Sequence, residues 1–499
     1  MKKLVSLALT LVLALTLAVP SHAAEPEAQA ETVGVILNGE RVAFSGAAPE
    51  LRDGKTMVPL RDLVESMGGE VTAHSGTLVC TFAGADGEKD TEVSVRPDES
   101  CYYKNGCTYV PVRAIAEPLG YDVFWDSGER SAVLIDRQAV IDRIDQQFTI
   151  LNGALKQLQQ EQDPNKNYRA QVDYILSVDA LDEISGQRTQ VKIDLSAATL
   201  ISSGAIELEL HTDLRDLGDL FLRDMVNNGA MTELQAAAIG KALEDLTLEG
   251  RYDITTGDLY FRFPALAQLN ALTGLNASRD DWYHLTLPPM SSLEDLSSIW
   301  MDSLGISQEL VEQIESGKLN SVGGIIYLYS TLLSQAPSQI TDNAEEAGKI
   351  LAQLFGDANF QTSGTTRKLH IGPQELEDLL GQEGALEEMF KTLGLDLTVR
   401  RDGSLAVALE LAFREDYLDG ESASLKGNMD LSKNKVVLDV TLHLSDLINF
   451  QYHMTETIRE TTEKPQTAPP AGAAVVELGD LEALMDMSPE SSAQVSAAA

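Results

Sequence analysis

The sequence has little cysteine, little positive charge and few long apolar runs, and each shortage limits what the protein can be. Its 3 cysteines permit at most one disulfide bridge. Lys and Arg total 37 against 77 Asp and Glu, so the net charge is −40. The electrostatic field of such a negative charge repels nucleic acid and anionic membranes, and we expect neither as a partner. Beyond residue 19, no segment approaches the roughly 20 apolar residues that a transmembrane anchor needs.

Catalytic motifs are also scarce. The segment Gly420–Ser424 lacks the closing glycine of a Gly-x-Ser-x-Gly elbow and falls in a predicted hairpin. Asp430–Asn434 begins like a calcium loop, but the sixth-position glycine and the distal glutamate are missing, which favours a plain turn. Beyond residue 23 no His-x-His or i,i+4 pair supports metal catalysis; the histidines are His74, His211, His284, His370, His443 and His453. We predict no catalytic residue, no metal and no cofactor.

The amino terminus predicts export. Lys2 and Lys3 precede the apolar stretch Leu4–Val19, and Ser21-His22-Ala23 supplies a small-residue cleavage site. This pattern is typical of a secretory signal over residues 1–23. No cysteine follows the cleavage site directly, which argues against a lipid-anchored lipoprotein. We expect a secreted, extracellular protein.

Residues 33–136 contain an internal repeat with an offset of 52 residues. Each copy predicts a strand that runs into a helix, because proline interrupts the strand and apolar residues follow at helical spacing. Gly68 and Gly120 predict the helix ends, since glycine tolerates the left-handed conformation that caps a helix. Seven identities fall in register: Thr56, Val58, Pro59, Arg61, Glu65, Gly68 and Val71 match Thr108, Val110, Pro111, Arg113, Glu117, Gly120 and Val123.

The motifs of this region point to a known family. The pattern V-x-L-N-G-x-x-V at residues 35–42, with a hairpin turn at Asn38-Gly39, precedes two copies of V-P-[LV]-R-x-[LI]-x-E-x-[LM]-G. This combination resembles the copper amine oxidase N-terminal domain family. The resemblance implies a small, non-catalytic α+β stalk module over residues 32–136, of a kind found in surface proteins of Gram-positive bacteria. It also implies association with the cell wall.

The residues that would make an amine oxidase are missing. Catalytic members of the family carry an Asn-Tyr-Asp/Glu motif whose tyrosine becomes the quinone cofactor, whereas Asn167-Tyr168 is followed here by Arg169. The His-x-His copper pair is absent as well. We predict that the protein is not an amine oxidase and not an enzyme.

The cysteines of the module leave two alternatives open. Cys101 and Cys107 flank a predicted hairpin and can form a bridge across its turn, with Cys80 left over. Alternatively, all three are reduced. A zinc site is less favoured because no Cys-x-x-Cys spacing supplies the remaining ligands.

Two arginines of the repeat are candidate ligand-binding residues. Arg61 and Arg113 each stand at the start of a repeat helix and can bind an anionic ligand. Alternatively, each pairs with a carboxylate one helical turn on, Glu65 or Glu117, and we favour this second interpretation.

Beyond the module the chain divides into three further parts. Residues 137–167 form a helical connector, with one amphipathic helix over Val140–Leu158 and a polar boundary at 159–167. Residues 168–460 form a β-rich domain with a helical insert at 292–393. The Thr-, Pro- and Ala-rich tail 461–499 is expected to be flexible, with a short helix over 475–485 docking back.

The β-rich domain contains a second repeat. Leu248–Thr255 parallels Leu425–Ser432, and Tyr283–Thr286 parallels Tyr452–Thr455. His284 and His453 occupy matched positions and could meet near a pseudo-twofold axis, although two half-exposed strand residues are the favoured account. The domain loosely resembles half-barrel lipoproteins of the LolA and LppX type. That resemblance implies an antiparallel sheet curved around an apolar cavity, with inserted helices covering one face.

The predicted fold class is therefore α+β: a stalk-like module, a connector helix and a half-barrel-like antiparallel domain. We expect a secreted, cell-surface-associated, non-catalytic binding or structural protein that holds an apolar ligand or an envelope component. The alternative is an extracellular hydrolase that uses paired carboxylates of the β-rich domain, since 77 acidic residues provide many spacings. A polar cleft with two carboxyl groups about 5 to 10 Å apart would favour that alternative.

Overall fold

The computed structural model describes residues 32–74, 76–83, 90–96, 101–158, 163, 165–181, 186–270, 276–287, 320–334, 336–381, 384–418 and 420–480. The described residues form two compact units. The module unit contains residues up to Gly153 together with 320–359, and the sheet unit contains 154–287 and everything from Phe360. The predicted signal, most of the polar boundary at 159–164, residues 288–319 of the predicted insert and the tail beyond 480 lie outside the described residues.

Three small sheets surround the core of the module unit. Their strand orders are β10-β11-β1-β2, β3-β4-β9-β8 and β5-β6-β7. The strands are β1 (Gly34–Leu37), β2 (Glu40–Arg41), β3 (Glu50–Arg52), β4 (Lys55–Pro59), β5 (Gly69–His74), β6 (Thr77–Phe82), β7 (Thr91–Val95), β8 (Tyr102–Lys104), β9 (Cys107–Pro111), β10 (Tyr121–Asp126) and β11 (Ser131–Asp136). The short helices are α2 (Leu60–Ser66), α3 (Val112–Ala116) and the 3-10 turn η1 (Glu117–Leu119).

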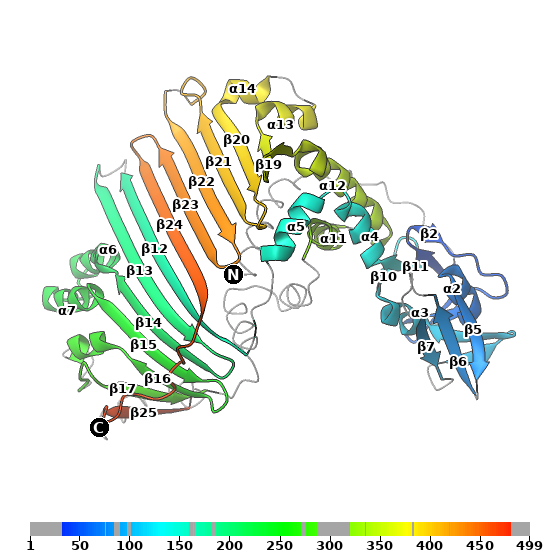
Figure 1. Cartoon of the computed structure of the whole chain (residues 1–499), viewed down its shortest axis with the longest axis horizontal. Helices are drawn as coiled ribbons and strands as arrows, with labels where there is room; N and C mark the ends of the chain where they lie inside the picture. Colours follow the sequence, from blue (N-terminus) through cyan, green and yellow to red (C-terminus); the bar gives the residue numbers. More distant parts are fainter. Residues whose placement is uncertain are drawn as a thin grey trace. The chain divides into compact units, whose positions relative to one another are not determined.

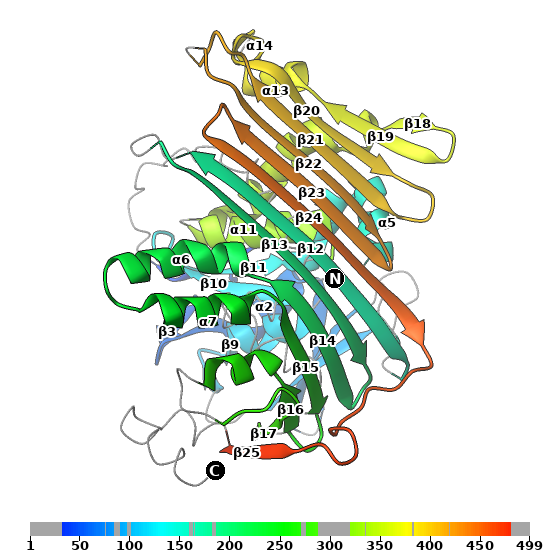
Figure 2. The ribbon, with the colours of Figure 1, turned by 90° about the vertical axis from the view of Figure 1, so that its left-hand side faces the viewer.

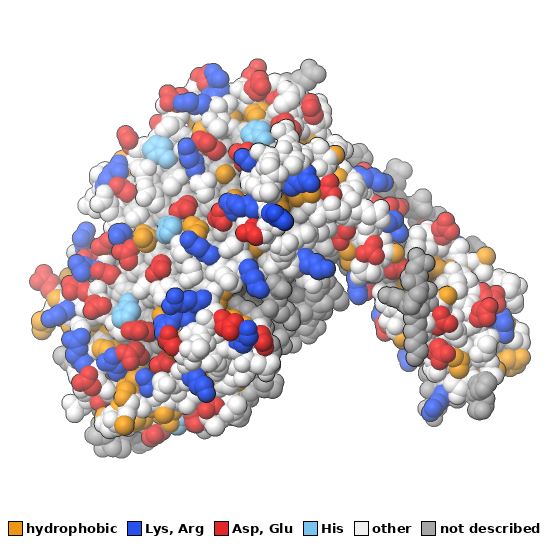
Figure 3. All heavy atoms as spheres, viewed as in Figure 1, with side chains coloured by type: hydrophobic (Ala, Val, Ile, Leu, Met, Phe, Trp, Pro, Cys, Tyr) orange, Lys and Arg blue, Asp and Glu red, His pale blue; other side chains and the backbone are white. Residues whose placement is uncertain are grey.

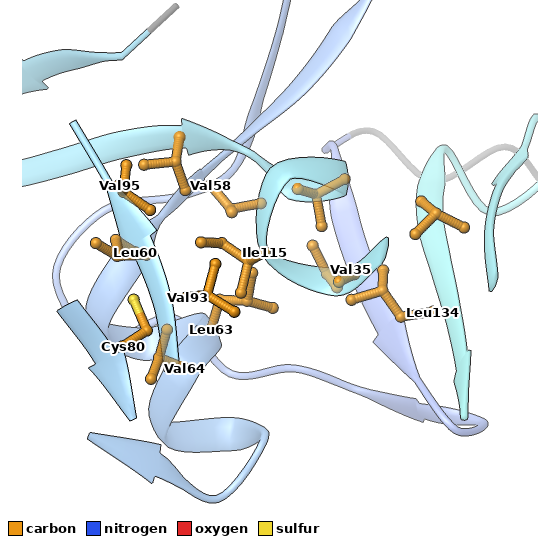
Figure 4. Close-up of a cluster of buried hydrophobic side chains, with 14 of the residues drawn as sticks. Val35, Val58, Leu60, Leu63, Val64, Cys80, Val93, Val95, Ile115 and Leu134 are labelled. Atoms are coloured by element: carbon orange, nitrogen blue, oxygen red, sulfur yellow. The ribbon is translucent and has the colours of Figure 1, made fainter. Parts of the chain in front are cut away.

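The two copies of the repeat pack against each other in this core. Val58 and Val110 are paired between β4 and β9, and both side chains are fully buried. Figure 4 shows Val58, Leu63 and Ile115 converging with side chains of the other sheets. Gly68 and Gly120 follow the helical segments with φ angles of 80° and 82°, which confirms their predicted capping role.

The connector is two helices, so the single helix predicted over Val140–Leu158 is wrong. These are α4 (Arg137–Asp145) and α5 (Thr149–Leu158). Between them the backbone forms a tight turn in which Phe148 N–H donates to the Asp145 carbonyl at 3.0 Å. The carboxylate of Asp357 then accepts the first amides of α5, from Thr149 at 3.0 Å and Ile150 at 2.9 Å. This cap provides acceptors for the free amides at the start of α5. The apolar periodicity of the sequence does not reveal that a second helix begins there.

Two helices of the predicted insert pack on α4 within the module unit, which the sequence did not predict. They are α11 (Val322–Leu333) and α12 (Ile340–Phe355), flanked by the 3-10 turns η3 (Pro337–Gln339) and η4 (Asp357–Asn359). The apolar stripe of α4 at Val140, Ile141 and Ile144 is buried. Asp145 of α4 accepts the Gly323 amide at 2.7 Å, which ties the start of α11 to the connector.

The sheet unit is built on one 14-stranded sheet with the order β18-β19-β20-β21-β22-β23-β24-β12-β13-β14-β15-β16-β17-β25. Neighbouring strands are antiparallel except β17 and β25, which are parallel. The strands are β12 (Asn167–Leu181), β13 (Arg188–Ile201), β14 (Ala205–Asp213), β15 (Leu246–Asp253), β16 (Asp258–Arg262), β17 (Trp282–Thr286), β18 (Gln361–Ser363), β19 (Thr366–Ile371), β20 (Phe390–Val399), β21 (Leu405–Phe413), β22 (Ala423–Ser432), β23 (Lys435–Leu444), β24 (Ile448–Thr461) and β25 (Val475–Asp480).

The sheet consists of two successive meanders. Strands β12 to β17 follow one another along the chain and in space, as do β18 to β24, and β24 then pairs with β12. Figures 1 and 2 show the strands curling as a half-barrel, which confirms the predicted α+β class and its curved antiparallel sheet. The remaining helical segments of this unit are α6 (Arg215–Asn227), α7 (Glu233–Leu243), η2 (Pro264–Leu269), α13 (Pro373–Leu380) and α14 (Ala385–Met389).

Candidate functional site

The two faces of the sheet differ in polarity because side chains alternate along every strand. Along β12, Tyr174 and Leu176 point to one face, whereas Asp173 and Ser177 point to the other. The strand register carries this division across the sheet. We call one row of residues, each directly paired with the next on the neighbouring strand, the apolar row. Its members, from β19 to β15, are Leu369, Leu397, Val407, Met429, Leu438, Met454, Tyr174, Leu195, Thr212 and Leu246.

The neighbouring row, one residue along each strand, is polar. This polar row is His370, Asp396, Ala408, Asn428, Asp439, His453, Ile175, Asp194 and Asp213. Figure 3 shows charged and histidine side chains spread over the outer surface of the curved sheet. The polar row therefore lies on the convex face, and the apolar row lines the concave face.

The concave face is apolar over ten adjacent strands but is not fully buried. Leu369 and Leu397 have 3% and 5% exposed surface, whereas the other eight side chains of the apolar row are half-buried. Tyr174 meets Tyr452 edge-on at 5.1 Å on the same face. The pairs Leu208–Gly250 and Leu409–Gly427 place a glycine beside a leucine at matched positions of the second repeat.

Two polar atoms of this apolar face lack a hydrogen-bond partner among the described residues. They are the Tyr252 hydroxyl on β15 and Thr212 Oγ1 on β14. Tyr252 is paired with Ile206 and Leu259 and is only 6% exposed. Its burial, with a smaller contribution from Asp253, raises the pKa of the phenol, so the hydroxyl is protonated and available as a donor.

The convex face carries a shallow trough of about 250 Å³ between β20 and β23. Three carboxylates line it, and each has a basic partner. Asp396 lies 2.8 Å from His370 Nδ1, Asp430 lies 2.8 Å from Arg400, and Asp439 lies 2.6 Å from His453 Nδ1. These pairs are half-exposed ion-pair or hydrogen-bond partners.

A serine, a histidine and an asparagine meet at the ends of β22 to β24. Ser422 Oγ lies 3.2 Å from His443 Nε2, and His443 Nδ1 lies 2.7 Å from Asn449 Oδ1. Sequence analysis missed this arrangement because the three residues belong to no common motif. The Ser422 amide donates to Ser445 Oγ at 2.8 Å and is therefore not free to stabilise an oxyanion. We interpret the group as a polar closure of the hairpin end.

The predicted meeting of His284 and His453 does not occur. His453 lies on β24 beside Asp439, whereas His284 lies on β17, separated by the strands β12 to β16. His284 Nδ1 lies 2.6 Å from Glu477 and Nε2 lies 3.0 Å from Asp258. The favoured alternative, two separate strand residues, agrees with this placement.

The tail between Thr462 and Asp480 runs along the sheet unit and is hydrogen-bonded to it. Asn167 Nδ2 donates to the Glu463 carbonyl at 2.9 Å, and Gln466 N–H donates to Glu207 at 3.0 Å. Residues Val475–Asp480 form the strand β25 and not the predicted helix. The consecutive residues Val475, Val476 and Glu477 pair in parallel with β17, and this pairing overrides the local amphipathic pattern.

The arginines of the repeat follow the favoured interpretation. Arg113 pairs with Glu117 at 2.8 Å, and Arg61 lies 3.8 Å from Glu65, each one helical turn on. All four side chains are more than half exposed, so these pairs contribute about 0.5 kcal/mol or less each. Pro59 and Pro111 end β4 and β9, and their role is structural.

Part of the module matches a known family of domains. Residues 89–167 match the copper amine oxidase N-terminal domain. This confirms the resemblance seen in the motifs for that segment, which contains the second copy of the repeat and both connector helices. The matched family is the N-terminal domain, not the catalytic domain, of those oxidases. No curated protein and no solved structure matches the chain.

Within the copper amine oxidase N-terminal domain, Cys101 and Cys107 form no disulfide. Cys107 is paired with Lys104, and the same register places Cys101 opposite Val110. Since Val110 is three residues from Cys107, the two thiols point to opposite faces of the hairpin. Cys101 packs against the buried core, and burial raises the pKa of the Cys80 thiol. The predicted bridge does not fit this register.

Among the described residues, no group of three or more His, Cys, Asp or Glu side chains is arranged to hold a metal ion. Among the same residues, no helix is long and apolar enough to cross a membrane.

Proposed function

We propose that the protein is an exported, cell-surface binding protein that holds an apolar ligand against the concave face of its curved sheet. The observation that carries the proposal is the apolar row, which crosses ten strands and remains half-buried over most of its length. At about 4.8 Å per strand, ten strands span roughly 43 Å. Apolar patches larger than a few hundred Å² on a folded protein mark binding surfaces.

The chemistry of this face favours a ligand with long hydrocarbon chains, such as an envelope lipid. Leucine, valine, methionine and tyrosine side chains dominate it, and each Å² removed from water contributes about 25 cal/mol.

The proposed attachment to the cell surface is supported by the amino-terminal part of the chain. The signal pattern at residues 1–23 supports export, and the copper amine oxidase N-terminal domain match supports a stalk role for the module. The module then presents the sheet unit at the envelope, where apolar ligands are found.

The protein acts without catalysis in this proposal. A hydrolase that uses carboxyl groups needs one acid with a raised pKa. Where the pKa of a described carboxyl group departs from its usual value, as at Asp126, Asp258 and Glu377, it is lowered. The carboxylates of the convex trough each lie beside a basic partner.

The test is extraction of the purified mature protein with organic solvent, followed by mass spectrometry. We expect a hydrocarbon-chain ligand in near-stoichiometric amount, or saturable uptake of added lipid. A preparation that neither carries nor takes up any apolar molecule would refute the proposal. So would turnover in a broad hydrolase screen that a single substitution abolishes.

A further inference from the structure

The carboxyl-terminal segment Thr462–Asp480 runs along the sheet as an extended strap. It leaves β24 at the centre of the sheet and ends as β25 on the edge of β17. Arg169 of β12 pairs with Glu463 near the start of the strap. The Trp282 amide donates to the Ala474 carbonyl at 2.9 Å at the other end. Figure 2 shows the strap passing beneath the ends of β12 to β16 before it reaches β17.

Arg251 on β15 is the first anchor of the strap. Its guanidinium donates to the Ala468 carbonyl and lies 3.5 Å from Glu207, whose carboxylate accepts the Gln466 amide. The same guanidinium lies over the ring of Trp282 at 4.9 Å. Arginine remains charged at every ordinary pH, so this anchor is insensitive to pH.

His284 on β17 is the second anchor, and its geometry requires a charged ring. Nδ1 faces Glu477 of β25 at 2.6 Å, and Nε2 faces Asp258 of β16 at 3.0 Å. A neutral imidazole has one N–H and can donate to only one of these carboxylates, whereas an imidazolium donates to both. The ring of Tyr260 also stacks on His284 at 4.4 Å. We call His284, Asp258 and Glu477 the clasp.

Little apolar surface holds the strap between its two anchors. Most of its side chains are exposed, and Val475 and Val476 of β25 retain 39% and 37% of their surface. Segments with few buried apolar contacts open at low free-energy cost, independently of the rest of the fold. The attachment of β25 therefore depends on its backbone ladder, on Arg251 and on the clasp.

We propose that the edge of β17 is a strand-accepting surface that the strap Thr462–Asp480 occupies reversibly, and that protonation of His284 locks it in place. An open sheet edge of this kind pairs readily with another extended chain. The strap covers this edge within the same molecule. Release of the strap exposes the edge to the corresponding segment of a second copy of the chain.

The direction of the pH effect follows from the clasp. Burial opposes the charged ring, but the hydrogen bonds to Glu477 and Asp258 outweigh it and raise the pKa of His284. The stabilisation is therefore complete below the pKa of a free histidine and is lost as the pH rises through the raised value. Hydrogen bonds from Thr256 and His284 lower the pKa of Asp258, so this partner stays ionised in the acid range, although Asp253 nearby opposes its charge.

Hydrogen exchange of the full mature chain tests the proposal. After correction for intrinsic rates, amides of β17 and β25 are expected to exchange several-fold faster at about pH 9 than at about pH 6, while amides shared by β12 and β24 keep one rate. His284→Asn is expected to give fast exchange at both values. His453→Asn, at the matched repeat position beside Asp439, is the control and leaves β25 unchanged.

Two further measurements keep the proposal falsifiable if His284→Asn disturbs folding. Glu477 is 71% exposed, so Glu477→Gln alters the clasp without touching the core and is expected to remove the pH dependence. A labelled peptide of residues 462–480 that carries Glu477→Gln, and therefore cannot form the clasp, is expected to bind the intact chain at about pH 9, where the strap is released, and not at about pH 6. Any of three results would overturn the proposal. They are hydrogen exchange in the wild-type protein that does not depend on pH, a pH dependence of exchange that remains in Glu477→Gln, and equal binding of the peptide at both pH values.

Discussion

Val58 and Val110, equivalent residues in the two copies of the repeat, lie directly opposite each other in the β4–β9 pair and are completely buried. Pairing of equivalent residues places a local twofold axis between the copies. The two repeats therefore share one core, and neither copy can bury its apolar face without the other.

Val58→Ala and Val110→Ala are each expected to lower the free energy of unfolding by about 2 kcal/mol, because two buried methyl groups are lost. Since the side chains are neighbours, the double variant should depart from additivity by about 0.5 kcal/mol or more. Urea denaturation measures both effects. Leu51→Ala on the adjacent β3, where the side chain is 52% exposed, is the control. Equal effects at Leu51 and Val58 would contradict the shared core.

Gly323 allows α11 to approach α4 closely. A Cβ at this position would lie 2.7 Å from the Ile141 carbonyl oxygen and 2.6 Å from Asp145 Oδ1. Gly323→Ala is therefore expected to destabilise the module unit by roughly 1 to 3 kcal/mol. Gly153→Ala in α5 meets nothing within 4 Å and should stabilise by up to about 1 kcal/mol through helix propensity. Thermal unfolding of both variants checks the opposite signs, and a neutral Gly323→Ala would refute the close packing.

The module unit requires two separate parts of the chain. A fragment of residues 24–160 lacks α11 and α12 and leaves the apolar stripe of α4 uncovered. We expect it to unfold at lower denaturant concentration than the same fragment joined by a flexible linker to residues 317–359. If both fragments unfold at one midpoint, the helical insert contributes nothing to this unit.

The Tyr252 hydroxyl is expected to contribute nothing to the stability of the fold. Because it has no described hydrogen-bond partner, Tyr252→Phe should leave stability unchanged or raise it slightly, whereas loss of a paired buried hydroxyl costs about 1 to 3 kcal/mol. Denaturation of the ligand-free protein measures this directly. A loss in that range would show that the hydroxyl already has a structural partner.

Sequence reasoning succeeded where local rules decide the outcome. The positive φ angles at Gly68 and Gly120 follow from capping chemistry, and the Arg113–Glu117 pair follows from helical spacing. The alternation in β12 is equally local, so the two faces of the sheet can be derived from it once the register is known.

Sequence reasoning failed where contacts between segments far apart in the chain determine the local structure. The break between α4 and α5 depends on Asp357, about 200 residues away, whose carboxylate caps the second helix. The strand β25 forms because it pairs with the edge of β17. The sequence of residues 475–480 does not by itself indicate this pairing. The group of Ser422, His443 and Asn449 likewise arises from strand register and leaves no motif in the sequence.

Adjacent residues on opposite faces of one strand provide the most direct test of the central claim. Ala197 lies on the concave face between Val172 and Leu210, whereas Ala198 lies on the convex face between Gln171 and Glu209. Titration of a fluorescent long-chain fatty acid against Ala197→Lys and Ala198→Lys compares the two faces in one position of the fold. The account predicts that affinity falls at least about tenfold, equivalent to about 1.4 kcal/mol, for Ala197→Lys and stays at the wild-type value for Ala198→Lys. Equal affinity of the two variants, or a loss confined to Ala198→Lys, would contradict it.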